Sequence, residues 1–171
     1  MNFKNLFSKI TLIFISILAF ACSKDIYPKI EEMQEQNIQE IISPNGVWIS
    51  ESIGALKEAI KPSVIQLFKS RADFHIINFN FLEADNQTAM FIEISNDEGK
   101  SSKVIFVKEV SFFRDAPDKC YTISCNGECS CTPSGTIHNG SVTFQCNGGC
   151  PCSMTVREFD CQPSPPPGGN N

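Results

Sequence analysis

Residues 125–131 read CNGECSC, and residues 146–152 repeat them as CNGGCPC. Both copies follow the pattern C-N-G-x-C-x-C, and all three cysteines recur at one constant offset. Cys120 and Cys161 flank the two copies, so this short segment contains eight of the nine cysteines of the 171-residue chain. The segment has too few large apolar side chains to build a hydrophobic core of its own, so the bonds of these cysteines decide how it folds.

Three uses of these eight cysteines are compatible with the sequence. A disulfide framework is favoured, because the number is even and the inferred compartment is oxidising, but eight cysteines allow on the order of a hundred connectivities. The C-x-C and C-x3-C spacing also resembles that of metallothionein, which implies a thiolate cluster for a soft ion such as Zn or Cu(I). The candidate ligands of that cluster are Cys125, Cys129, Cys131, Cys146, Cys150 and Cys152. Thiol redox chemistry is the third use, and the C-x2-C motif typical of it is absent.

The segment between the two copies predicts a β-hairpin. An Asn-Gly dipeptide at 139–140 lies between branched and aromatic residues, which is a strong signal for a two-residue type I′ turn. Such a turn places Ile137 opposite Val142 on the two strands. The same register, extended into the repeats, places Cys129 opposite Cys150. A proline and a glycine interrupt that ladder, so this pairing stays one option among several.

Upstream of the cysteines the hydrophobic period is two, which is typical of strands. Three segments show it: residues 74–82 (FHIINFNFL), 88–94 (TAMFIEI) and 103–110 (KVIFVKEV). Polar, turn-forming residues separate these segments, so they predict a three-stranded antiparallel meander.

Helices are predicted before this meander. Residues 26–42 carry apolar side chains at helical spacing on an otherwise acidic segment. A second helix is predicted to begin at a cap, Ser50 or Ser52, and to run to Ile60, with Pro62 ending it or opening another turn. The expected fold class is α+β: an N-terminal helix or helices packed on a three-stranded antiparallel meander, followed by a small cysteine-rich β-hairpin module.

The first 21 residues have the three parts of a secretory signal. Lys4 and Lys9 make a positive start, residues 10–20 (ITLIFISILAF) form an apolar run, and small residues precede a cleavage point. The run falls well short of the ~20 residues that span a bilayer. The sequence therefore predicts export, with removal of residues 1–21.

Leu18-Ala19-Phe20-Ala21-Cys22 resembles the lipobox of bacterial lipoprotein precursors. This resemblance implies a lipid on the Cys22 thiol and anchorage in the cell envelope, with the outer membrane as the expected site. It also explains the odd cysteine count, since eight remain once Cys22 carries the lipid; a secreted chain with one unpaired thiol is the alternative. Ser23-Lys24-Asp25 resembles a surface-export signal of some Gram-negative lineages, and a plain polar tether fits it equally well.

The expected organisation has five parts. Residues 1–21 are the signal peptide, 22–46 the tether and amphipathic helix, 47–113 the α+β domain, 114–161 the cysteine-rich module with its internal repeat, and 162–171 a disordered Pro/Gly tail.

Composition and motifs narrow the function. A net charge of −5 gives no positive field for nucleic acid. The sequence contains no nucleophile elbow, zinc-protease, phosphate-loop or dinucleotide motif. It therefore favours a non-enzymatic, lipid-anchored envelope protein without a cofactor, which binds an unknown protein or glycan partner or serves in structural display. A thiolate metal-binding protein is the alternative, and a hydrolase without a local signature is the third hypothesis.

Overall fold

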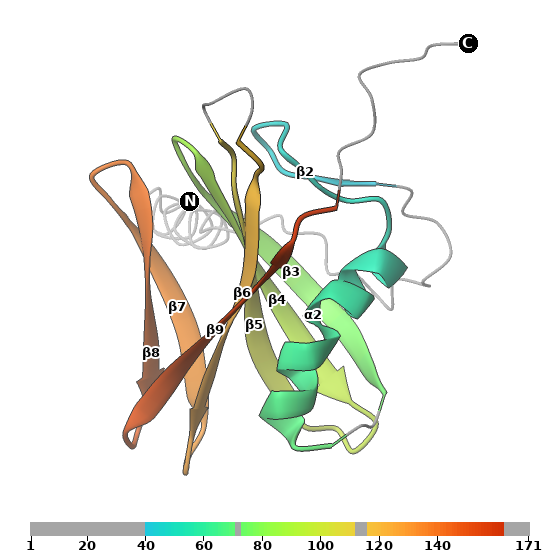
Figure 1. The fold of residues 1–171 in the computed structure, drawn as a ribbon. Helices are drawn as coiled ribbons and strands as arrows, with labels where there is room; N and C mark the ends of the chain where they lie inside the picture. The colour runs from blue at the N-terminus through green and yellow to red at the C-terminus, as the bar shows by residue number, and fades with distance from the viewer. Residues whose placement is uncertain (1–39, 71–72, 112–115, 163–171) are drawn as a thin grey trace, which may run out of the picture.

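The computed structural model describes residues 40–70, 73–111 and 116–162, and in this part of the chain the fold has three layers (Figure 1). The central layer is a five-stranded antiparallel sheet. Helix α2 packs on one face of this sheet, and the two-stranded hairpin β7–β8 packs on the other. No helix in the described ranges is long and apolar enough to cross a membrane.

The five strands of the sheet lie in the order β3-β4-β5-β6-β9. Their bounds are β3 Phe74–Ala84, β4 Gln87–Asn96, β5 Ser101–Glu109, β6 Lys119–Gly127 and β9 Cys152–Asp160. The other elements are β1 (Ile41–Ile42), β2 (Trp48–Ser50), α2 (Ile53–Phe68), β7 (Cys131–His138) and β8 (Ser141–Gly148). β1 and β2 pair with each other in a small separate sheet.

The prediction of a three-stranded sheet is wrong. The three predicted segments fall in β3, β4 and β5, but β6 and β9 from the cysteine-rich segment extend the same sheet to five strands. The sequence of β6 does not show the hydrophobic pattern of a core strand, because two of its buried positions hold small polar residues. These are Thr122 and Ser124, and each is 1% exposed. Thr122 meets Ser63 of α2 there, with the two hydroxyl oxygens 2.6 Å apart.

Helix α2 is longer than predicted. It runs unbroken from Ile53 to Phe68 with Pro62 inside it. Leu56, Ile60 and Val64 continue one buried stripe across the proline. Their burial against the sheet outweighs the cost of about 3 kcal/mol for a proline within a helix.

The start of α2 agrees with the prediction of a serine cap. The Ser52 side chain is the N-cap and accepts a hydrogen bond from the Ala55 N–H at 3.1 Å.

The segment before α2 does not agree with the prediction of a helix. The helix predicted over 26–42 lies outside the described residues except for its last three. There Ile41–Ile42 forms strand β1 and pairs with β2, so the helical prediction is wrong at that end.

The sheet is buried on both faces. Met90 and Phe106 face α2, whereas their chain neighbours Ala89 and Ile105 face the hairpin. Strands covered on both sides read as nearly continuous apolar runs, as β5 does.

The C-terminal half of the fold is one long hairpin folded back on itself. The turn at 139–140 has positive φ at both residues, and Ile137 faces Val142 as predicted. The pairs of β6 with β9 keep the register of β7 with β8: in both ladders, the numbers of facing residues sum to 279. Between the two ladders both strands bend, so that β7 and β8 return over one face of the sheet (Figure 1).

Two contacts hold the β7–β8 hairpin against the sheet. Gly135 of β7 lies against the Phe91 ring: a Cβ at this position would meet Phe91 Cζ at 2.8 Å, and Leu82 and Val142 at 3.3 Å. The Val142 N–H donates to Gln87 Oε1 at 2.9 Å. Gly135, which made the ladder uncertain in the sequence, therefore allows β7 to approach the sheet closely.

Replacing Gly135 with Ala is expected to lower the free energy of unfolding by about 1–3 kcal/mol, because the added Cβ overpacks the contact with Phe91. Gly149→Ala is the matched control, since a Cβ there meets nothing within 4 Å, and its effect should stay within about 0.5 kcal/mol. Urea unfolding of the oxidised protein measures both variants. Equal free energies of unfolding for the two variants would contradict the close contact between β7 and the sheet at Gly135.

Candidate functional site

The eight C-terminal cysteines form four disulfides, which confirms the favoured prediction for them. Three bonds join each cysteine of the first repeat to its counterpart in the second, 21 residues further on; these are Cys125–Cys146, Cys129–Cys150 and Cys131–Cys152. The fourth bond joins the flanking pair, Cys120 and Cys161. Cys22, the predicted lipid carrier, lies outside the described residues.

The three repeat disulfides clamp the bend of the long hairpin. Cys129–Cys150 lies within the bend and joins the β6–β7 connection to the β8–β9 connection, which is the pairing that the extended register offered as one option. Cys125–Cys146 joins β6 to β8, and Cys131–Cys152 joins β7 to β9, so each ties the sheet to the hairpin that folds over it. The bend cannot open while these bonds are intact.

Close packing at the bend explains the glycine in each repeat. A Cβ on Gly127 would lie 2.5 Å from the Sγ of Cys131 and 2.9 Å from the carbonyl oxygen of Pro151. A Cβ on Gly148, the equivalent position, would lie 2.7 Å from the Sγ of Cys152 and 2.8 Å from the Ser130 oxygen. Both glycines thus leave room for a sulfur and for the backbone of the opposite turn.

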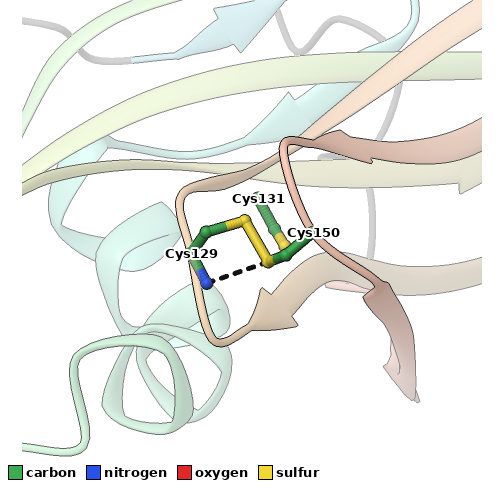
Figure 2. Close-up of side chains that lie close together, drawn as sticks. All are labelled: Cys129, Cys131 and Cys150. Atoms are coloured by element: carbon green, nitrogen blue, oxygen red, sulfur yellow. Dashed lines mark hydrogen bonds between the residues drawn. A yellow bond between two sulfur atoms is a disulfide. The ribbon is translucent and has the colours of Figure 1, made fainter.

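Three sulfur atoms gather at the bend (Figure 2). The Sγ atoms of Cys129, Cys131 and Cys150 lie within 4.8 Å of one another, and the Cys129 N–H donates to Cys150 Sγ at 3.0 Å. These are three of the six candidate metal ligands. In the four-disulfide state all six are bonded in pairs and carry no thiolate charge, so a soft metal ion would require the reduced form.

A surface depression of about 590 Å³ lies at the opposite end of β6 and β9 from the bend. The disulfide between Cys120 and Cys161 contributes to its wall, together with Phe159. Its charged lining residues are Asp118, Lys119, Glu158 and Asp160. Because acidic groups are in excess, the depression suits a cationic or hydroxyl-rich ligand better than an anion.

A polar network connects the sheet to the hairpin. Gln87 Nε2 donates to Glu109 Oε1 at 2.9 Å and to the Tyr121 hydroxyl at 2.7 Å, and that hydroxyl donates to the same Glu109 oxygen at 2.9 Å. The amide oxygen of Gln87 then accepts the Val142 N–H. Burial, followed by the hydrogen bond to Glu109, raises the pKa of the Tyr121 phenol well above its ordinary value.

Lys108 is a buried cation that was not among the predicted site residues. Its side chain is 3% exposed, and its Nζ lies 3.3 Å from Asp118 Oδ2 and donates to the Trp48 carbonyl at 3.0 Å. The alternating pattern of β5 could have indicated the burial of Lys108, because a period of two places it on the same face as Val104 and Phe106 of the core. These contacts join β5 to β2 and to the segment before β6.

The unreduced mature protein is expected to show no reactive thiol among the eight C-terminal cysteines, and to gain two hydrogens per disulfide on reduction. Intact mass before and after alkylation measures this directly. In a Cys125→Ser variant, Cys146 should become the one reactive thiol, because its partner is gone. Eight reactive thiols in the wild-type chain would exclude this disulfide set.

The Tyr121 phenol is expected to stay protonated in the folded protein well above its ordinary pKa of about 10. Because the folded state holds this proton more tightly than the unfolded state, its contribution to stability is complete below about pH 10 and is lost as the pH rises further. Phenolate absorbance compared between wild type and Tyr121→Phe isolates this titration, since the chain has only one other tyrosine, Tyr27. A difference signal that develops around the ordinary pKa would contradict the burial argument.

Comparison with known proteins does not place this geometry in a family. No family model, no curated protein and no solved structure matches the chain. Its function is therefore argued from its own residues: the clamped bend, the acidic depression at the other end of the sheet, and Cys22.

Proposed function

We propose that this protein is a non-enzymatic lipoprotein of the cell envelope, anchored through a lipid on Cys22. It presents a disulfide-clamped domain to a protein or glycan partner. The outer membrane is the proposed location, and the segment after Cys22 serves as the tether.

The observation that carries the proposal is the division of the cysteines. The four disulfides use all eight C-terminal cysteines, so Cys22 is left as the ninth. An unpaired thiol is a liability in an oxidising compartment, because it forms mixed disulfides. A thioether to lipid removes that liability. Stable anchorage then needs two or more acyl chains, each contributing about 0.8 kcal/mol per buried CH₂.

A binding or display role is supported by how the described domain is built. Cross-links at both ends of the β6–β9 ladder, at the bend and at Cys120–Cys161, restrict its motion, which favours a preorganised surface. The acidic depression beside Cys120–Cys161 supplies carboxylates that accept hydrogen bonds from hydroxyl groups, and its volume of about 590 Å³ is in the range of small-ligand sites. This depression is the proposed contact for a glycan or a basic protein segment.

Thiolate metal binding is the second candidate, favoured by the proximity of three sulfur atoms at the bend. In the reduced chain, Cys129, Cys131 and Cys150 would supply soft ligands for Zn or Cu(I). Thiol counting on the unreduced protein separates the two proposals: paired cysteines favour the display protein, whereas free thiols with bound metal favour the metal protein.

A Cys22→Ala variant is expected to lose all incorporation of a labelled fatty acid and to leave the membrane fraction, because the thiol that carries the lipid is gone. Metabolic labelling followed by fractionation of the producing cells measures both. Ser23→Ala, one residue further on, is the matched control and should label like the wild type. Equal labelling of the Cys22→Ala chain would overturn the proposed anchor.

A further inference from the structure

Strand β9 is an open edge of the five-stranded sheet. Within the described residues it pairs only with β6, in one register from Cys152 to Asp160 and without a bulge. Two large apolar side chains on the same side of the strand, Met154 and Val156, are 40% and 53% exposed. An unbulged, partly apolar edge of this kind is a template for pairing with another strand.

The opposite edge, β3, is built differently. Its ladder with β4 shifts register between Ile76 and Asn78, which is the signature of a bulge. Near its other end, Glu83 accepts hydrogen bonds from the Ser43 hydroxyl and the Asn45 N–H of the β1–β2 turn. Bulges and covering loops are two devices by which proteins block an edge, so in the described part of the chain the sheet has one blocked edge and one open edge.

We propose that a second copy of this chain pairs with the first through β9, in antiparallel fashion, and makes one continuous ten-stranded sheet about a twofold axis. Pairing of open edge with open edge uses the same surface on both copies and closes at two. A head-to-tail arrangement would need β3 as the acceptor and would grow into a fibre, which the bulge in β3 opposes.

The sequence of β9 selects one register for this pair. The twofold axis that relates two antiparallel edge strands is perpendicular to the sheet. Facing residues of the two copies therefore point to the same side of the sheet. The residue on the axis faces the same residue of the second copy. Centring the pair on Arg157 or on Glu158 would place like charges opposite each other, which is destabilising. Centring it on Thr155 places Met154 opposite Val156 of the second copy, and does so twice. In this register each of the four exposed apolar side chains has another of them directly opposite, whereas centring the pair on Val156 would place Met154 opposite Glu158.

A single added cysteine tests this register in the full-length protein. In Thr155→Cys the two new thiols face each other, at a spacing for facing residues that suits a disulfide, so a reducible species of twice the mass is expected. Arg157→Cys is the matched control on the same side of the strand, and its thiols are out of register. Co-expressing Ser153→Cys with Arg157→Cys should restore the link, because these two positions face each other.

Changing the apolar pair tests the driving force. Adding Met154→Lys and Val156→Lys to Thr155→Cys is expected to reduce the cross-linked fraction by about tenfold, because facing lysines replace facing apolar residues. Ile137→Lys on the β7–β8 hairpin is the control, since Ile137 is as exposed, at 50%, and lies off this edge. Intact mass showing four native disulfides verifies folding of every variant.

Three outcomes would overturn the proposal. If the Thr155→Cys and Arg157→Cys variants cross-link equally, the two copies touch without the fixed strand register that is proposed. A cross-linked species of another mass would assign the edge to a different protein. A Thr155→Cys thiol that is protected from alkylation without a doubled mass would assign the edge to another segment of the same chain.

Discussion

The fold depends on one strand register that is kept on both sides of a bend. Because the facing residues of β7–β8 and of β6–β9 follow the same register, the two C-N-G-x-C-x-C copies reach the bend together. Each cysteine then meets its own counterpart: two of the resulting disulfides hold the hairpin against the sheet, and the third, Cys129–Cys150, closes the bend. At about 2–4 kcal/mol each, these bonds compensate for a segment with few large apolar side chains.

Folding a hairpin back over a sheet brings backbone groups into the interior, and specific side chains satisfy them. Gln87 accepts the Val142 N–H and, with Glu109 and Tyr121, forms a network in which each member has a partner. On the other face, Lys108 donates to the Trp48 carbonyl and lies beside Asp118. Losing one member of such a buried pair costs more than the pair itself contributes, so these residues make the layered arrangement specific.

The same construction bears on function. Cross-links at both ends of the β6–β9 ladder restrict the motion of the domain, and the four disulfides use eight of the nine cysteines, so Cys22 is the ninth and the proposed lipid carrier. The acidic depression and the open edge of β9 share one end of that strand, because Glu158, Phe159 and Asp160 of β9 line the depression. A ligand in the depression and a second copy at β9 are two proposals, and each has its own test.

Local chemistry by itself determined several parts of this protein. The Asn-Gly dipeptide set the turn and the register from Ile137 to Val142, Ser52 set the start of α2, and the even cysteine number indicated four disulfides. Only the tertiary structure decided that β6 and β9 complete the sheet, that α2 continues through Pro62, and which of many disulfide pairings forms. The reason is that these outcomes depend on which distant surfaces are buried together. Thr122 is a core residue only because Ser63 meets it, and Gly135 is required only because Phe91 lies beneath it.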